Sequence, residues 1–437
     1  MEKTNVPHVL FLPFPAQGHI KPMLSLAELL SHAGFQATFI NTDHNYDHLF
    51  QSSRTVFKPA LRELLISLKE GKGPCQLPTC IIADGILCFA IDVAQEFEIP
   101  TLSFRTYSAH CLWTYFHLSK LIEEGEVPFQ DENFDKPISC IPGLENVLRR
   151  RDLPGICRFE NADDPVLQFF VKETSALTRA SGLILNTVNE IEAPIITRLG
   201  SFFNKIYAIG PLHTLKSRIN DSSASNSSNG ILWKEDKKCL RWLDSQPSRS
   251  VLYVSFGSVI SLTSDQILEF LYGLLNSKKS FLWVIRPDLI VGDATIGHTL
   301  MELEKGVMER GLIVSWAPQE EVLSHPAIGG FLTHSGWNST LESIVAGVPM
   351  ICWPQIADQP VNSRCVSEVW KMGFDMKDTC DRSIVEKLVR ELMDNKTEEI
   401  MASANKLARL ARDSIKEDGS SFINLEKLIQ DIKSMTS

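Results

Sequence analysis

One short segment of the chain has the residue types and spacing of an anion-binding site. The run Gly329 to Thr333 indicates a short strand, and Ser339 to Ala346 indicates a helix that Gly347 ends, where a left-handed residue fits. Between them lies His334-Ser335-Gly336-Trp337-Asn338-Ser339. A glycine-containing turn and a helix N-terminus rich in Ser and Asn present free backbone N–H groups and the helix dipole, which favour phosphate. The alternative is a capped helix with a buried histidine, and the hexapeptide alone fits both.

Residues on both sides of this hexapeptide add groups that suit a nucleotide sugar. Trp316 offers an aromatic plane for a base, and Gln319 offers an amide for the base edge or the ribose. Glu342 lies one turn into the helix, near enough to accept from ribose hydroxyls. Asp358 and Gln359 follow the next apolar run, in a loop at the sheet edge where α/β proteins bind ligands. The set indicates a base platform, a ribose carboxylate, a diphosphate cradle and two polar groups for a sugar.

The elements that must position these groups alternate between short β-rich apolar runs and helical patterns. This alternation predicts an α/β fold with parallel sheets covered by helices on both faces. We expect a helix over Asp265–Asn276 with Ser264 as its cap, and the spacing of Ser383 and Glu386 predicts a capping box. The expected strands, besides the run ending at Thr333, are His8–Phe14, Phe35–Asn41, Thr101–Phe104, Gly182–Asn186, Val251–Phe256, Phe281–Ile285 and Pro349–Trp353.

Length and composition limit the class of protein. A chain of 437 residues is too long for one core, so we expect two domains. The contents of 44% hydrophobic and 22% charged residues are those of globular proteins and exclude wholesale disorder. The net charge of −10 argues against nucleic acid or an acidic membrane as partner. We expect Arg149, Arg150 and Arg151, the densest basic run, to form a solvated face or pair with carboxylates rather than bind phosphate.

A change in composition marks the domain boundary. The stretch Ser217–Gly230 is rich in Ser and Asn and predicts a surface linker. We therefore expect domains over residues 1–216 and 237–415, joined by residues 217–236. The start lacks the pattern of a signal peptide, and no run approaches the roughly 20 apolar residues of a membrane span. Ten scattered cysteines without a CxxC pair indicate reduced thiols, so we expect a cytoplasmic protein.

The motifs together resemble those of the plant family-1 UDP-glycosyltransferases. The 44 residues from Trp316 to Gln359 are similar to that family's signature box. The resemblance extends over essentially the whole chain, through FPAQGHIKPM, CIIADG, IPGLENVLRRRDLP, LILNTVNEIE and YVSFGS. It implies a GT-B fold, which is two Rossmann-like doubly wound parallel-sheet domains facing a cleft. The C-terminal half would bind the UDP-sugar and the N-terminal half the acceptor, with a last helix at about 416–437 packed back on the N-terminal domain.

The resemblance also implies which side chains contact the donor. The glutamine at the last position of the box accompanies glucose in this family, so Gln359 favours UDP-glucose. Carried onto the matching positions, the donor contacts are Trp316 and Ala317 for uracil, Gln319 and Glu342 for the ribose, Ser258, His334, Asn338 and Ser339 for the diphosphate, and Trp337, Asp358 and Gln359 for the sugar.

An acceptor hydroxyl needs a base, and His19 is the candidate. A lone loop histidine is more often structural, which is our interpretation of His8, His44 and His48, but the family motif favours His19 as catalytic. The matching aspartate is Asp84, which would orient His19 and stabilise its imidazolium form, whereas alone it fits a helix cap equally well. The implied reaction is one in-line displacement that inverts an α-linked donor to a β-glucoside, with no metal required.

The acceptor side is less defined by the sequence. Arg105, where many relatives have tryptophan, could pair with an acidic acceptor such as an iridoid acid, or form a structural ion pair. An apolar acceptor, terpenoid or phenolic, suits the aromatic residues of this half. The expected acceptor contacts are Phe14, Gln17, Arg105, Tyr107, His110 and Trp113.

The chain departs from the family in one region. Relatives carry several tens more residues before Asp84, where this chain joins directly through Ser53-Arg54-Thr55-Val56. That segment normally walls the acceptor pocket. The alternative function is therefore a UDP-sugar-binding protein with impaired or no transfer. We expect a monomer whose partners are the UDP-sugar and a small-molecule acceptor.

Overall fold

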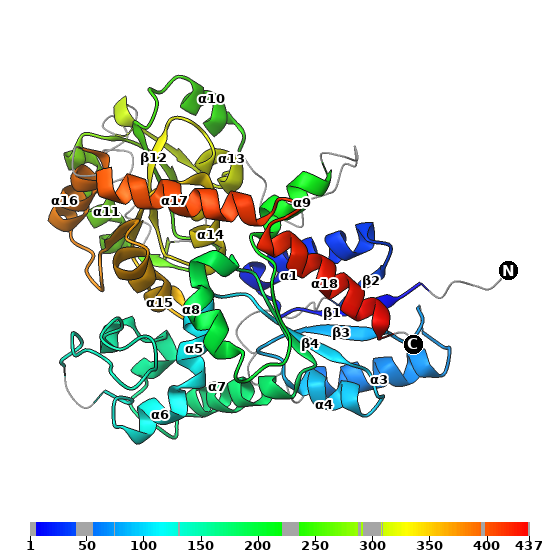
Figure 1. The fold of residues 1–437 in the computed structure, drawn as a ribbon. Coiled ribbons are helices and arrows are strands. Elements are labelled where there is room, and N and C mark those ends of the chain that lie inside the picture. Colours follow the sequence, from blue (N-terminus) through cyan, green and yellow to red (C-terminus); the bar gives the residue numbers. More distant parts are fainter. Residues whose placement is uncertain are drawn as a thin grey trace.

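The molecule consists of two lobes, each built on a six-stranded parallel sheet (Figure 1). The computed structural model describes residues 6–40, 56–73, 75–129, 132–220, 236–286, 290–291, 307, 309–394 and 398–435. The parallel sheets confirm the predicted α/β class. Six strands, β1, β3, β4, β5, β7 and β13, are buried along their whole length, which is why they read as continuous apolar runs rather than alternating ones.

The first sheet has the strand order β2-β1-β3-β4-β5-β6, with every neighbouring pair parallel. Its strands are β1 (His8–Leu12), β2 (Gln36–Phe39), β3 (Cys80–Asp84), β4 (Thr101–Arg105), β5 (Gly182–Leu185) and β6 (Ile206–Ala208). The helices of this half are α1 (Gln17–His32), α3 (Lys58–Lys69), α4 (Phe89–Gln95), α5 (Ala109–Phe116), α6 (Leu118–Glu123), α7 (Pro165–Ala176), α8 (Asn189–Leu199) and α9 (Leu212–Asn220), with short helices at Arg150–Asp152, Gly155–Arg158 and Leu177–Arg179.

The second sheet has the order β11-β9-β7-β12-β13-β14, again parallel throughout. Its strands are β7 (Val251–Ser255), β9 (Ser280–Val284), β11 (Gly311–Val314), β12 (Ile328–Thr333), β13 (Met350–Cys352) and β14 (Gly373–Asp375), and a separate pair is β8 (Leu262–Thr263) with β10 (Ile290–Val291). The helices are α10 (Lys238–Asp244), α11 (Ser264–Ser277), α13 (Gln319–Leu323), α14 (Trp337–Ala346), α15 (Gln359–Arg364) with a π-helical turn at Cys365–Val369, α16 (Arg382–Met393) and α17 (Glu398–Ser414).

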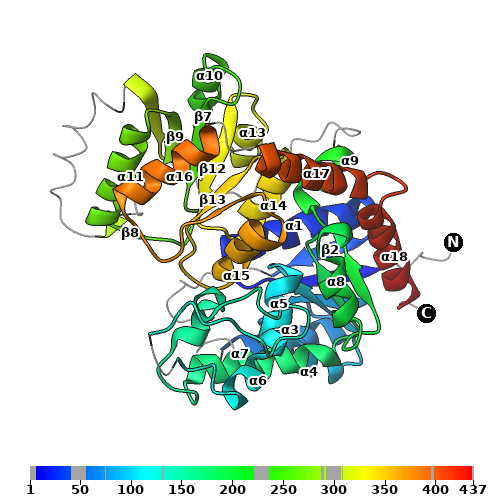
Figure 2. The same cartoon turned by 60° about the vertical axis from the view of Figure 1, so that its left-hand side comes forward.

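The end of the chain returns to the first lobe. Helix α17 leads across from the second lobe to α18 (Ser420–Ser434), which lies beside the first sheet in both views (Figures 1 and 2). Leu425 and Leu428 of α18 share an apolar cluster with Val9 of β1. The Asn424 side chain donates to the Ala208 carbonyl at 3.1 Å.

The lobes also meet directly, through hydrogen bonds and ion pairs. The Trp337 indole donates to the Asn186 carbonyl at 2.7 Å. Arg149 pairs with Asp375 of the other lobe at 3.1 Å. Other ion pairs of the basic run are those of Arg149 with Asp152 and Asp135, of Arg150 with Glu126, and of Arg151 with Asp135 and Asp378. The prediction of carboxylate partners for this run is thus confirmed.

Helix ends show where local sequence signals held and where they failed. Gly347 has φ +72° and ends α14, as predicted. The cap of α11 is Thr263, one residue before the predicted Ser264, because Thr263 and Gln266 bond each other's backbone N–H groups. The capping box at Ser383 is wrong, since Asp381 caps α16 by accepting from the Ser383 backbone at 2.8 Å.

Further expectations concern cysteines, membrane helices and the linker. All ten cysteines are free thiols. None of the helices in the described part of the chain is long and apolar enough to cross a bilayer. The stretch predicted as a linker begins inside α9, which extends to Asn220, and the rest of it lies outside the described residues.

Candidate active site

A cavity of about 420 Å³ lies between the lobes, at the carboxyl ends of strands from both sheets. Parallel sheets place their ligand sites at this edge because loops that leave neighbouring strands converge there. Most of the predicted site residues line the cavity: Phe14, Gln17, His19, Tyr107, Ser258, Trp316, Ala317, Gln319, His334, Trp337, Asn338, Ser339, Glu342, Asp358 and Gln359.

His19 and Asp84 form a pair on the first lobe, in which Asp84 is buried and His19 is partly exposed. His19 lies in the first turn of α1 and not in a loop as expected, and its Nδ1 is 2.6 Å from Oδ2 of Asp84 at the end of β3. Burial alone would raise the pKa of Asp84, but His19, the Ile86 N–H and Arg105 outweigh it, so this pKa lies below its usual range. The carboxylate therefore stays charged, and Nε2 is the ring nitrogen of His19 that remains for a substrate.

Sequence analysis missed a second neighbour of His19. The Thr106 hydroxyl is 3.0 Å from Nδ1 of His19, and Thr106 lines the cavity. It follows β4, so three neighbouring strands supply the surroundings of the histidine. A threonine after a strand carries no local signal of this role. The other assessed histidine, His8, is buried with both ring nitrogens bonded, to the Gln76 carbonyl and Thr38, which confirms a structural role. His44 and His48 lie outside the described residues.

The second lobe forms the opposite wall of the cavity, which includes the residues predicted to bind the nucleoside. The Gln319 amide donates to Oε2 of Glu342 at 2.6 Å and to Ser339 at 2.9 Å, so the two predicted ribose residues bond each other. Glu342 is only 5% exposed. Lys21 of the first lobe also reaches Glu342, at 2.8 Å from Oε1, a contact that sequence analysis missed.

The part of the wall that was predicted to bind phosphate is the N-terminus of α14. Its N-cap is Gly336, which has no side chain to cap the helix, and the Asp358 carboxylate accepts from the backbone N–H of Trp337 in the first turn. The His334 ring fits between two glycines, since an added Cβ would lie 2.6 Å from it at Gly257 and 2.5 Å at Gly336. Burial and the Arg286 cation lower the pKa of His334 to about 4. The imidazole is therefore neutral near pH 7.

Ser258, the remaining predicted diphosphate contact, is held by a buried arginine. Arg286 donates to the Ser258 carbonyl at 2.7 Å and to the Ile260 carbonyl at 2.8 Å. Because Arg286 is 3% exposed, it fixes the path of this loop from within the lobe. Among the described residues, no cluster of three His, Cys, Asp or Glu side chains could hold a metal.

The part of the cavity that was predicted to bind the sugar combines Asp358, Gln359 and Trp337. Asn362 donates to Oδ2 of Asp358 at 2.6 Å and accepts from Ser108 of the other lobe at 2.8 Å. Burial raises the pKa of Asp358 to about 6, so it is mostly ionised near pH 7. The side-chain carbonyl of Gln359 accepts hydrogen bonds from two backbone N–H groups, which leaves its side-chain NH₂ for a ligand. The Trp337 ring lines the cavity, but its N–H is used by the lobe contact.

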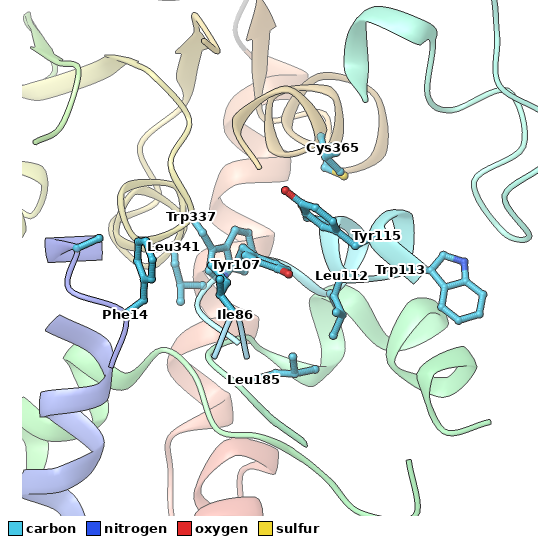
Figure 3. Packing of buried hydrophobic residues seen from close by; sticks show 14 of the residues in the cluster. Phe14, Ile86, Tyr107, Leu112, Trp113, Tyr115, Leu185, Trp337, Leu341 and Cys365 are labelled. Carbon is cyan, nitrogen blue, oxygen red and sulfur yellow. The ribbon is translucent and has the colours of Figure 1, made fainter. Parts of the chain in front are cut away.

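The remaining part of the cavity is apolar. Figure 3 shows Phe14, Ile86 and Tyr107 gathered in this region, with Tyr115 projecting from α5, and all four line the cavity. The indole of Trp113 projects away from the other labelled side chains in this view. Ile86, in the turn after β3, and Tyr115 were not predicted. For Tyr115 the reason is that the face that α5 turns inward cannot be read from its sequence.

Three predicted acceptor contacts lie outside the cavity, contrary to expectation. The Trp113 indole donates to the Pro142 carbonyl, and His110 pairs with the buried Glu192 at 2.6 Å. Arg105 is 1% exposed, lies over the ring of Tyr107 at 4.9 Å, and has no hydrogen-bond partner among the residues that the structure describes. It acts on the site through its charge, which helps to lower the pKa of Asp84.

The arrangement can carry out one kind of chemistry. A histidine backed by a carboxylate can take a proton from a group in the apolar part of the cavity. The helix N-terminus across from it can stabilise a departing phosphate, and the polar groups between them can hold a sugar.

Comparison with known proteins agrees with this chemistry. A family model described as UDP-glucoronosyl and UDP-glucosyl transferase matches residues 230–415. The 7-deoxyloganetic acid glucosyltransferase of Catharanthus roseus is 46% identical over 477 residues, which cover 99% of each chain. Mogroside I-A1 synthase of Siraitia grosvenorii is 45% identical over 449 residues, 94% of this chain and 85% of that protein. The crystal structure of Medicago truncatula UGT71G1 complexed with UDP-glucose has a TM-score of 0.81 at 27% identity, with 98% of both chains covered.

The alignments also show that this chain is short. The alignment with the Catharanthus roseus protein has 477 positions against 437 residues here, so at least 40 positions have no counterpart in this chain. The join predicted at Ser53-Arg54-Thr55-Val56 lies, up to Thr55, outside the described residues.

Proposed function

Because this chain belongs to that family of UDP-glucosyltransferases and has its GT-B fold, we propose that His19 and Asp84 carry out its catalytic step in the cavity between the lobes. The enzyme transfers glucose from UDP-glucose to a small apolar metabolite. The observation that supports the assignment most directly is the 2.6 Å contact between Nδ1 of His19 and Oδ2 of Asp84. It leaves Nε2 for the acceptor, in a cavity that Asn338 lines from the other lobe.

The proposed reaction is a single displacement. Nε2 of His19 takes the proton of an acceptor hydroxyl as the oxygen forms a bond to the anomeric carbon of glucose. The bond from that carbon to the diphosphate breaks, and its electron pair leaves with UDP. Attack from the opposite face converts the α-linked donor to a β-glucoside. Asp84 holds the ring orientation and stabilises the imidazolium that forms.

The donor would lie along the second lobe. We assign uracil to Trp316 and Ala317 and the ribose to Gln319 and Glu342. The diphosphate would lie at the N-terminus of α14, where the helix dipole offsets its charge. Ser258, His334, Asn338 and Ser339 complete this subsite, and Asp358, Gln359 and the ring of Trp337 would contact glucose.

No metal is needed in this scheme, because backbone N–H groups and neutral side chains stabilise the leaving diphosphate. Activity should therefore be the same in excess EDTA as in magnesium chloride. A strong requirement for magnesium would contradict this part of the proposal.

The acceptor class rests on the apolar wall and on the relatives. Phe14, Ile86, Tyr107 and Tyr115 suit a terpenoid, an iridoid or a phenol. The Catharanthus roseus relative is named for 7-deoxyloganetic acid, and it is 46% identical to this chain. We therefore place iridoid acids first among the acceptors to test.

The test uses the full chain, UDP-glucose and a panel of iridoid acids, terpenoid alcohols and phenols, with mass spectrometry of the products. We expect a glucoside from the wild type and none from His19→Ala, while calorimetry shows unchanged UDP binding to that variant. Near-normal turnover by His19→Ala would show that another group is the base.

The alternative is a protein that binds the UDP-sugar without transferring it. The observation that favours it is the absence here of at least 40 positions present in the alignment. A chain that binds UDP-glucose but forms no glucoside with any acceptor would support it.

Three assignments accompany the proposal. We propose a cytoplasmic location and a monomer, which a fluorescent fusion in plant cells and light scattering would test. We also keep the division into residues 1–216, 217–236 and 237–415 as the proposed domain organisation.

A further inference from the structure

Lys21 connects the catalytic helix of the first lobe to the opposite wall of the cavity. It lies two residues after His19 on α1. Its Nζ is 2.6 Å from Oε1 of Glu320 and 2.8 Å from Oε1 of Glu342, both in the second lobe. The proposed proton transfer and displacement use none of these contacts.

The charges in this cluster depend on one another. Burial alone would lower the pKa of Lys21, but the carboxylates of Glu342 and Glu320 outweigh it and raise this pKa, so the ammonium stays charged. A buried carboxylate is costly without partners, and Glu342 is only 5% exposed. Lys21 is the cation that Glu342 contacts.

The two oxygens of Glu342 are each held by a different residue. Oε1 accepts from Lys21, and Oε2 accepts from Gln319 at 2.6 Å. A carboxylate can accept about four hydrogen bonds, so two more donors can be accommodated. All three side chains line the main cavity. Behind them, a space of about 10 Å³ touches Lys21, His213 and Glu342, which is room for about one water and not for a sugar.

We propose that Lys21 is a specificity residue of the donor site, which fixes Glu342 to accept the two vicinal hydroxyls of the nucleotide ribose. A residue of the acceptor lobe would thereby contribute to donor recognition. The inference rests on the ribose position proposed above. Replacing Lys21 should raise KM for UDP-glucose about ten-fold, the loss typical of a hydrogen bond to a charged group, and leave kcat within about two-fold. His19 and the phosphate wall remain in place in such a variant.

The test compares the wild type with Lys21→Met. Calorimetry measures the affinity of each protein for UDP and for 3′-deoxy-UDP, and the comparison is repeated with 2′-deoxy-UDP. We expect Lys21→Met to weaken UDP binding about ten-fold but binding of the deoxy nucleotide by less than about three-fold. Lys21→Arg should restore UDP binding, because a guanidinium also donates to two carboxylates. The matched control is Lys205→Met, which removes a 3.2 Å ion pair with Asp431 and should change neither affinity.

The outcomes distinguish this inference from the proposed function. If Lys21→Met weakens UDP and both deoxy nucleotides by one common factor, Lys21 acts through the lobe contact, and the ribose role is wrong. If the wild type binds UDP and the deoxy nucleotides equally, the ribose does not contact Glu342, and both the inference and that donor placement fail. Glucoside formation by the same preparation then shows that the transferase assignment still stands. If a melting experiment shows that Lys21→Met is unfolded, the folded Lys21→Arg variant provides the test. The inference is then overturned if Lys21→Arg no longer binds UDP more tightly than the deoxy nucleotides.

Discussion

The imidazole of His19 and the carboxylate of Asp84 lie 2.6 Å apart, although 65 residues separate them in the chain. The strands β1 and β3 are neighbours in the first sheet, so the segments that follow them leave the same edge. Asp84 also accepts from the Ile86 N–H at 3.0 Å, which fixes the carboxylate from a second side. The fold thus holds the Asp84 carboxylate from two sides.

Removing the charge of Asp84 tests this relationship. In Asp84→Asn the amide cannot stabilise the imidazolium and can favour the wrong tautomer, so we expect kcat to fall by about 10³ to 10⁴. KM for UDP-glucose should change little, since the donor contacts belong to the other lobe. The control is Asp92→Asn, which affects a partly exposed carboxylate paired with Lys58 and Arg179. A fall of less than ten-fold in kcat would contradict the orienting role.

His334 should make stability depend on pH. Its pKa is about 4 in the folded protein and about 6.5 when unfolded, so the unfolded chain takes up this proton first as the pH falls. The stability that the neutral His334 contributes to the fold is complete above about pH 6.5 and is lost progressively between about pH 6.5 and pH 4. The glutamine side chain in His334→Gln cannot be protonated. The melting temperature of this variant should therefore fall less than that of the wild type between pH 7.5 and pH 4.5. Equal losses would show that His334 protonates freely in the fold.

Gly257 should be essential to the phosphate wall. It has φ +72°, and a Cβ there would lie 2.6 Å from the His334 ring, so Gly257→Ala must displace that ring or the Ser258 loop. We expect its Kd for UDP to rise at least ten-fold. Gly34→Ala is the matched control, because Gly34 has φ +90° with nothing within 4 Å of the added Cβ. It should cost about 1 kcal/mol of stability and leave UDP binding unchanged. Equal UDP binding by both variants would exclude the steric role.

Local sequence patterns predicted the ends of the expected strands to within a few residues. Runs such as Val251–Ser255 are buried along their length, and turn residues bound them, so neither face has to be known to recognise a strand. The helix end at Gly347 was equally local, because it depends on one residue's freedom to adopt positive φ. The wrong cap at Ser383 shows the limit of that logic, since Asp381 offered a competing acceptor two residues earlier.

The site could be predicted only where a motif kept its residues together in sequence. His334, Glu342 and Asp358 line one cavity because one strand, one helix and the next loop carry them. The acceptor wall depends on which face α5 turns inward, and Tyr115 faces the cavity whereas Trp113 does not. Contacts between lobes have no local signal at all.

Asn362 is such a contact, and it joins the sugar end of the cavity to the first lobe. It is fully buried, and its NH₂ donates to Asp358 at 2.6 Å and to the Ser335 carbonyl at 3.0 Å. Its carbonyl accepts from Ser108, which caps α5. Asn362 therefore sets the position of the Asp358 carboxylate without lining the cavity itself.

The substitution Asn362→Asp should separate sugar recognition from nucleotide binding. A second carboxylate beside Asp358, whose pKa is already about 6, raises that pKa further, so more of Asp358 is protonated near pH 7. We expect kcat to fall at least ten-fold at pH 7 and to recover partly at pH 8.5, while calorimetry shows unchanged affinity for UDP alone. Ser108→Ala removes the lobe contact together with the cap of α5, but it adds no charge beside Asp358, so kcat should stay within about three-fold. A uniform loss of kcat at both pH values would mean that Asn362 supports the fold of the loop rather than the charge of Asp358.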